Sequence, residues 1–229
     1  MSFVIAALAW VLDPAHWPGP GGIGDRLTQH LWYSVLAVLL AGVIALPLGL
    51  WIGHTGRGRA VAIGLSGALR ALPSLGLLTF LAVALGVGID QALLPSTIVL
   101  AVLAIPPILA GAYAGVEAID PDVVDGARAV GMSERQIVTG VEMPLAAPMI
   151  LGGFRSAMLQ VIATATIAAY LGLGGLGRFI LDGLPVRDYP RMLAGALLVT
   201  LLALLVDGLL SLLQHRLTTA GVRASTGTD

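Results

Sequence analysis

The stretch TQHLWYSVLAVLLAGVIALPLGLWI, residues 28–52, contains no acidic residue and no Lys or Arg. An α-helix rises about 1.5 Å per residue, so this stretch is long enough to cross the roughly 30 Å hydrocarbon core of a bilayer. Trp32 and Trp51 lie near its ends, about 28 Å apart along a helix, and Trp favours both membrane–water interfaces. The sequence therefore predicts a transmembrane helix here.

Four further apolar stretches have a similar length, at residues 60–84, 92–116, 144–171 and 191–214. The whole chain is 57% hydrophobic and only 11% charged, with a mean hydropathy of +0.94. A typical soluble domain has about 25% charged residues. We therefore expect an all-α integral membrane protein with about five transmembrane helices, surrounded by membrane lipid.

Charge and cysteine content exclude several classes of function. The net charge is −1, so the chain lacks the basic surface of a nucleic-acid-binding protein. It has no cysteine, which excludes disulfides, thiolate metal sites and a Cys nucleophile.

The arginines predict the orientation of the helices. With five spans, Arg57, Arg59, Arg128, Arg135, Arg216 and Arg223 fall on one side, and Arg26, Arg178, Arg187 and Arg191 on the other. The positive-inside rule then places the N-terminus outside, and residues 117–143 and the C-terminus in the cytoplasm. The predicted organisation is an interfacial segment over 1–27, a transmembrane domain over 28–216 and a flexible cytoplasmic tail over 217–229. A partial re-entrant helix is the alternative for the first segment.

One polar stretch, DPDVVDGARAVGMSERQIVTGVEMP at residues 120–144, interrupts this apolar chain. Asp120 before Pro121 is typical of a helix start. Gly131 then interrupts the helix, and Ser133 with Gln136 three residues later predicts the cap of a second short helix that ends at Pro144. The stretch has no nucleophile–base pair, no metal-ligand cluster and no phosphate-cradling glycine loop. Its shape suits docking against a soluble partner.

This stretch resembles the "EAA" loop of the membrane subunits of ABC importers, with the spacing kept without a gap. The matching positions are Asp125, Gly126 and Ala127, then Gly131, then Val141, Met143 and Pro144. The resemblance implies a type I importer fold, in which a coupling helix within loop 118–143 docks into a cytoplasmic ATPase subunit. The residues that would make this contact are Asp125, Gly126, Ala127, Arg128, Gly131, Met132, Ser133, Arg135 and Pro144.

Other stretches resemble the osmoprotectant branch of these importers. They are ALPSLGLLTFLA at 71–82, IPPILAGAYAGVEAID at 105–120 and ATATIAAYLGLGGLGRFILDGL at 163–184. The resemblance implies a permease for glycine betaine, choline, carnitine or proline. A permease for another small solute, such as methionine, is the alternative, because similar glycines occur in those proteins.

The partners and cofactors also follow from the resemblance. It implies ATP-binding subunits that carry ATP and Mg²⁺, a second permease subunit in a homo- or heterodimer, and an extracytoplasmic solute-binding protein. No cofactor is expected on this chain. It has no Lys and no P-loop, so it is not itself an ATPase. A membrane-embedded enzyme and a passive channel are the rival classes, and neither the converging ionisable groups of the first nor the charge rings of the second are visible.

Two further sets of residues are candidate sites. Prolines and polar residues within the spans indicate bent helices around a translocation path, with Arg70, Pro73, Ser74, Thr164, Thr166 and Asp207 as its candidate residues. Arg70 and Asp207 are expected to be almost the only ionisable groups in the spans, either as a buried pair or each facing the path separately. In loop 172–190, Gly172, Gly174, Gly175, Gly177 and Phe179 predict a short helix that serves as an outer gate or as a contact for the binding protein. An ordinary connecting loop is the alternative.

Overall fold

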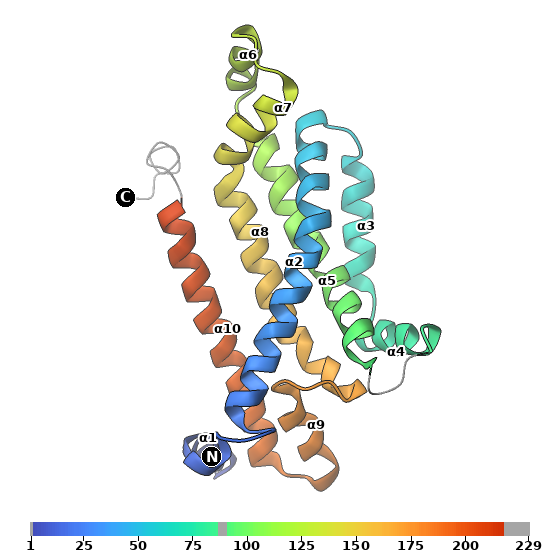
Figure 1. The fold of residues 1–229 in the computed structure, drawn as a ribbon, viewed down its shortest axis with the longest axis vertical. Helices are drawn as coiled ribbons and strands as arrows, with labels where there is room; N and C mark the ends of the chain where they lie inside the picture. The colour runs from blue at the N-terminus through green and yellow to red at the C-terminus, as the bar shows by residue number, and fades with distance from the viewer. Residues whose placement is uncertain (1, 87–90, 218–229) are drawn as a thin grey trace. The chain divides into compact units, whose positions relative to one another are not determined.

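The computed structural model describes residues 2–86 and 91–217, and all regular structure in this part of the chain is helical (Figure 1). The helices are α1 (Ser2–Leu12), η1 (Pro14–His16), α2 (Ile23–Thr55), α3 (Arg59–Ala71), α4 (Ser74–Ala84), α5 (Leu93–Glu117), α6 (Pro121–Ala129), α7 (Glu134–Ile137), η3 (Val138–Glu142), α8 (Met143–Thr164), η4 (Ala165–Leu171), α9 (Gly177–Val186) and α10 (Tyr189–Leu217). The all-helical prediction is confirmed. The predicted tail over 217–229 begins at the last residue of α10, and the rest of it, residues 218–229, lies outside the described residues.

Four stretches in the described residues are single helices long and apolar enough to cross a membrane. They are Ile23–Thr55, Leu93–Glu117, Glu134–Leu171 and Tyr189–His215. The predicted second span, 60–84, is instead two helices, α3 and α4, with a bend of 88° at the break. Pro73 causes the break, because its backbone is extended (φ −67°, ψ 112°) and its ring disfavours a helical residue before it. Which face of the membrane each end meets stays a prediction.

The chain divides into two compact units. Unit 1 comprises Met1–Leu39, Leu72–Leu103 and Met158–Val206, and unit 2 comprises Leu40–Ala71, Ala104–Ala157 and Asp207–Asp229. Four long helices, α2, α5, α8 and α10, contribute residues to both units.

In unit 2, small residues let the helices pack closely. A Cβ added to Gly49 would lie 2.5 Å from Cβ of Ala112, and one added to Gly111 would lie 2.6 Å from the carbonyl oxygen of Met149. Gly49 belongs to α2, Gly111 to α5 and Met149 to α8, so glycine sets the close contacts of α5 with both neighbours. Helices in lipid associate through such small-residue packing because apolar side chains gain little by leaving lipid.

Unit 1 has a core in which α9 and the end of α8 pack against the first part of α2 and against α10. Its largest buried cluster contains Ile23, Ile162, Leu176, Phe179, Leu198, Val199 and Leu202. Trp10 from α1 packs against this cluster, so the N-terminal helix is part of the folded unit. The predicted interfacial position of this helix is not tested.

Proline within the helices leaves carbonyl groups that need other donors. Pro107 in α5 has no N–H, so it cannot bond the carbonyl of Leu103, four residues earlier. The side-chain amide of Gln160 donates to that carbonyl at 2.9 Å. A side chain thus replaces the missing backbone donor, as lipid-embedded helices require.

The predicted end of the polar helix at Pro144 is wrong. The chain continues from α7 through the π-helical segment η3 into α8 without a break, as one stretch over Glu134–Leu171. Pro144 removes an α-type hydrogen bond to Gly140 and its ring crowds that carbonyl. A wider π-turn over Val138–Glu142 separates these groups, so the helix accommodates the proline.

Candidate functional site: the polar helical segment

The segment from Asp120 to Glu142 in unit 2 is built by local capping. Asp120 accepts a hydrogen bond from the backbone N–H of Asp122 at 3.0 Å, with Pro121 at the first helical position of α6. Ser133 and Gln136 form a reciprocal capping box at the start of α7. Both caps are as predicted, because they depend only on residues two or three positions apart.

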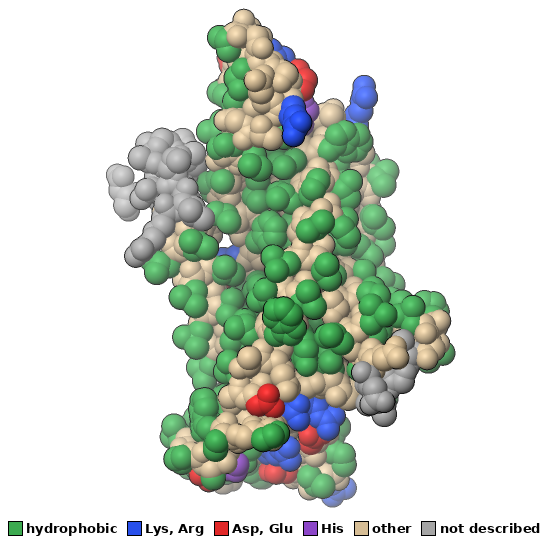
Figure 2. Space-filling model, in the orientation of Figure 1, with side chains coloured by type: hydrophobic (Ala, Val, Ile, Leu, Met, Phe, Trp, Pro, Cys, Tyr) green, Lys and Arg blue, Asp and Glu red, His purple; other side chains and the backbone are tan. Residues whose placement is uncertain are grey.

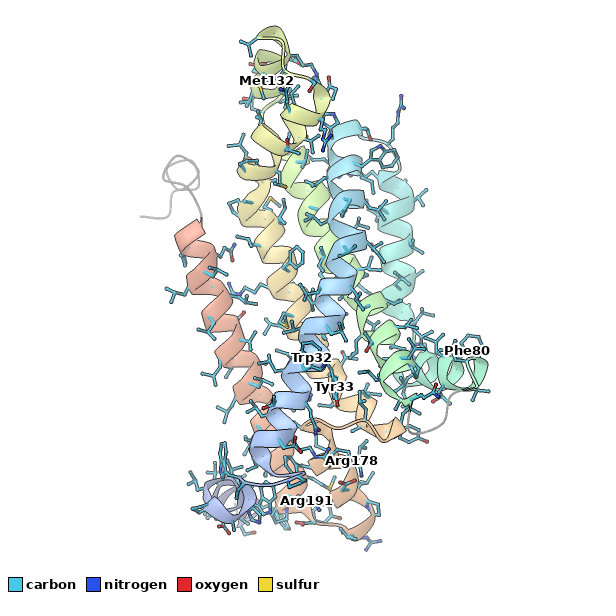
Figure 3. All side chains as sticks on the ribbon, viewed as in Figure 1. Trp32, Tyr33, Phe80, Met132, Arg178 and Arg191 are labelled. Atoms are coloured by element: carbon cyan, nitrogen blue, oxygen red, sulfur yellow. The ribbon has the colours of Figure 1, made fainter. Side chains whose placement is uncertain are left out.

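Gly131 forms the corner between α6 and α7. Its φ is +90°, and a Cβ added there would meet nothing within 4 Å. Glycine is therefore needed at this position for its backbone conformation and not for space. Met132, which follows the corner, lies at the turn between the two helices (Figure 3).

Charged side chains tie α6 to α7. Arg128 donates to Asp125 at 3.0 Å and to both carboxylate oxygens of Glu134 at 2.9 and 3.1 Å. The hydrogen bonds from Arg128 to Glu134, and then to Asp125, raise the pKa of the Arg128 guanidinium. The corner is therefore held by a charged hydrogen-bond network that lies at the surface.

The same segment presents an apolar surface that this chain does not cover. Val130 is 78% exposed and Val123 is 44% exposed. Of the predicted coupling residues, Ala127 is buried and Met132 half-buried, whereas the others are exposed, namely Asp125, Gly126, Arg128, Gly131, Ser133, Arg135 and Pro144. Charged side chains gather over α6 and α7, in contrast to the apolar surface of the long helices (Figure 2).

Two contacts anchor this segment to the end of α2. His54 Nδ1 lies 2.9 and 2.8 Å from the two carboxylate oxygens of Glu142, and Nε2 lies 3.0 Å from a carboxylate oxygen of Glu134. Glu142 is only 3% exposed. Sequence reasoning missed this cluster, because 88 residues separate His54 from Glu142.

The glycine-rich loop of unit 1 is positioned by a buried histidine. His30 Nε2 donates to the carbonyl of Ile162 at 2.9 Å, and His30 Nδ1 accepts from the N–H of Leu176 at 3.2 Å. Gly175 has a φ of +89°, and a Cβ there would lie 3.1 Å from His30 Nδ1. The loop therefore needs glycine both for conformation and for space. Sequence analysis assigned no role to His30.

The predicted short helix in loop 172–190 is present as α9. Gly172 ends η4 with a left-handed backbone, Gly174 lies against Gln29, and Gly177 lies against Thr166. Phe179 is 3% exposed in the core, beside Trp10 and under Arg191. Its ring therefore serves the packing of unit 1. Arg178 and Arg191 both pair with Asp182, at 2.7 and 3.6 Å (Figure 3).

Two of the candidate path residues, Arg70 and Asp207, do not pair with each other. Asp207 pairs with Arg155 of α8 through two hydrogen bonds, one of them at 2.6 Å. Arg70 is exposed and has no ion pair among the described residues. The hypothesis of an Arg70–Asp207 pair is therefore wrong within this chain. The ion-pair partner of Asp207 is Arg155 instead. Arg155 was overlooked, although an arginine within an apolar stretch is itself a signal.

The other path candidates lie in unit 1 and have local roles. Pro73 precedes α4, which Ser74 begins, and the hydroxyls of Thr164 and Thr166 donate to Gln160 and Ala163. A cavity of about 380 Å³ in the same unit is lined by Trp10, His16, Phe179, Asp188 and Arg191, among others. His16 stacks on Trp10 with ring centroids 4.2 Å apart, so that aromatic face is already occupied.

Within residues 2–86 and 91–217, no group of three or more His, Asp or Glu side chains could hold a metal ion. The site thus consists of an exposed, pre-ordered helical segment anchored to a membrane helix. Its shape and its uncovered apolar residues suit the binding of another protein.

Comparison with known proteins identifies the family. Residues 45–219 match the family described as binding-protein-dependent transport system inner membrane component. The chain belongs to this family. It is a multi-pass component of the inner membrane, and the predicted resemblance is confirmed.

Curated relatives cover most of the chain. The carnitine transport permease protein OpuCB of Listeria monocytogenes is 38% identical over 85% of this chain and 88% of its own. The choline transport system permease protein OpuBB of Bacillus subtilis is 34% identical over the same shares. The osmoprotectant import permease protein OsmW of Salmonella typhimurium is 34% identical over 93% of this chain and its whole length.

A solved structure shares the fold. The inward-facing MetNI methionine ABC transporter contains a chain that superposes with a TM-score of 0.73 at 20% identity, covering 86% of this chain and 96% of that one. At this identity the likeness concerns the fold alone. The type I importer fold predicted from the coupling segment is confirmed.

Proposed function

We propose that this chain is the permease subunit of an ATP-driven importer for a small compatible solute, of the glycine betaine, choline, carnitine or proline group. The observation that carries the proposal is 34–38% identity to carnitine, choline and osmoprotectant permeases over 85–93% of the chain. The chain moves the solute and hydrolyses no ATP itself. The energy comes from a separate ATPase that holds ATP and Mg²⁺.

In this proposal, the segment Asp120–Glu142 receives the motion of the ATPase. Its exposed Val123 and Val130 would be covered by the partner, and the Asp125–Arg128–Glu134 network fixes the segment before docking. Pre-ordering lowers the conformational entropy that binding would otherwise cost. The segment then faces the cytoplasm, as the positive-inside rule predicts.

A second permease subunit and an external solute-binding protein complete the assembly. Two different carnitine transport permease proteins of Listeria monocytogenes, OpuCB and OpuCD, are both similar to this chain, at 38% and 31% identity. Two related permeases in one organism support a heterodimer. The glycine-rich loop of unit 1 is the proposed outer gate or contact for the binding protein.

Uptake by the reconstituted complex tests the substrate. The complex of this chain with its partner permease, ATPase and binding protein is placed in vesicles, and uptake of labelled glycine betaine, choline, carnitine, proline and methionine is measured. We expect ATP-dependent uptake of at least one of the first four and none of methionine. Uptake of methionine alone would overturn the substrate class.

A pair of matched valine variants tests the docking surface. Val130→Asp places a charge in the proposed interface, and Val186→Asp places the same charge at a valine of α9 that is 70% exposed. We expect the first variant to lose the ATPase on co-purification and the second to retain it. Equal retention by both variants would contradict docking at α6.

A further inference from the structure

His54 lies between two carboxylates that belong to different parts of the polar segment. Glu134 begins α7, and Glu142 ends η3. The imidazole contacts Glu134 through Nε2 at 3.0 Å and Glu142 through Nδ1 at 2.8 Å. One ring from the last turn of α2 thus contacts both the first and the last residue of the stretch Glu134–Glu142.

These two contacts require more N–H donors than a neutral imidazole has. A neutral imidazole carries one N–H, and an ionised carboxylate can only accept. Both ring nitrogens face carboxylate oxygens within hydrogen-bonding distance. The three groups therefore share one proton beyond those of a neutral imidazole and two carboxylates, which makes His54 a donor at both nitrogens.

The surrounding charges assign this proton to the histidine. Glu134 already accepts two hydrogen bonds from Arg128, which favours its ionised form. Glu142 is buried, with 4% of its side chain exposed, and accepts from His54. A buried carboxylate is costly unless it is paired, and a protonated His54 supplies the pair.

The other polar and charged groups described near this end of α2 form no hydrogen bond or ion pair with His54. Arg59 of α3 pairs with Glu117 of α5 at 3.4 Å. Arg135 of α7 lines the cavity beside His54 and is exposed. The backbone carbonyl oxygen of Tyr113 in α5 lies against Gly53 of α2. His54 is therefore the group of α2 that balances Glu142.

We propose that His54 is a positioning residue for coupling, which in its doubly donating form locks the segment Glu134–Glu142 onto the end of α2. This proposal rests on the proposed role of the segment in docking the ATPase. The lock makes α2 move together with the docked segment. Loss of either carboxylate contact frees one end of the segment, so motion of the ATPase is transmitted less well.

Glu142→Gln is the variant that separates positioning from mere stability. A glutamine amide can donate to Nδ1 while neutral His54 donates from Nε2 to Glu134. The lock then closes without an extra proton. Glu142→Gln should therefore retain coupling, whereas Glu142→Leu, which can neither donate nor accept, should lose it.

The first measurement is solute uptake per ATP hydrolysed by the intact complex in vesicles. We expect the ratio to fall about tenfold with Glu142→Leu, as for the loss of one hydrogen bond to a charged group, and to stay near the wild-type ratio with Glu142→Gln. His215→Gln, a change at an exposed histidine of unit 2, should also keep the wild-type ratio. A wild-type ratio with Glu142→Leu would overturn the proposal.

A second measurement does not depend on transport. The chain has no cysteine, so Thr55→Cys with Thr139→Cys gives two spin labels at exposed positions on α2 and η3. The distance distribution should be narrow in wild type and with Glu142→Gln, and broad with Glu142→Leu. Equal widths in all three proteins overturn the lock, whereas failure of the ATPase to co-purify with the wild-type complex would count against docking itself.

Discussion

His30 near the start of α2 and His54 near its end contact opposite kinds of groups. In unit 1, His30 bonds one carbonyl and one backbone N–H, so it must donate from Nε2 and accept at Nδ1. In unit 2, His54 bonds two carboxylates, so it must donate from both nitrogens. An added proton would break the first arrangement, and a removed proton would break the second. The partners of a histidine, and not its place in a helix, decide which of its ring nitrogens must donate.

Replacing His30 should have the largest effect on stability. His30→Ala removes the side-chain partner of the carbonyl of Ile162 and of the N–H of Leu176, at a residue that is only 1% exposed. Each unpaired buried group costs about 1–3 kcal/mol, so the expected loss is about 2–6 kcal/mol. Thermal unfolding in detergent measures it. His30→Gln can both donate and accept, so it should recover part of the loss, and a loss as large as that of alanine would contradict the assigned role.

Replacing a glycine by Asn should destabilise the protein to a different extent at Gly131 in unit 2 and at Gly175 in unit 1. Asn adopts positive φ more readily than most residues. Gly131 has open space around it, so Gly131→Asn should cost less than about 1 kcal/mol. Gly175 lies against His30, so Gly175→Asn should add about 1–3 kcal/mol of overpacking. Unfolding of both variants in the same detergent checks the order, which would be reversed if Gly131 were closely packed.

The Arg155–Asp207 pair offers a charge contact that needs no shared proton. Both side chains are partly exposed, so the effect should be smaller than that of His30. Arg155→Ala and Asp207→Ala should each destabilise the chain, and the double variant should lose less than the sum. Additive losses in the double-mutant cycle would show that the two residues act independently.

Removing one cap should have the smallest effect. Ser133→Ala removes the side-chain acceptor at the start of α7. The expected cost is about 1 kcal/mol, typical of an N-cap. Ser133→Asp keeps an acceptor and should be close to wild type. Hydrogen exchange at the backbone N–H of Gln136 measures the change, and equal protection in all three proteins would contradict a role for the cap.

Local features of the fold could be predicted from the sequence. The Asp120 cap, the Gly131 corner and the Ser133–Gln136 box involve residues a few positions apart, so their spacing is sufficient to predict them. The apolar stretches are long enough to identify spanning helices. Pro73 was ambiguous, because a proline in such a stretch is compatible with either a kink or a complete break.

The long-range polar contacts could not be predicted. His30 and Ile162 are 132 residues apart, and Arg155 and Asp207 are 52 apart. Helical periodicity assigns a face to each residue but does not say which helix lies opposite. The buried polar groups of this chain therefore find partners that only the packed structure reveals.

The π-helical turn over Val138–Glu142 also changes the angle at which the residues before it project from the axis of the helix that runs from Glu134 to Leu171. A π-turn holds one residue more than an α-turn, and each α-helical residue occupies about 100° around the axis. Deletion of one residue from the turn, with return to α-geometry, would rotate α7 by about that angle relative to α8. Glu134 would then swing away from His54, although every residue of the contact would still be present.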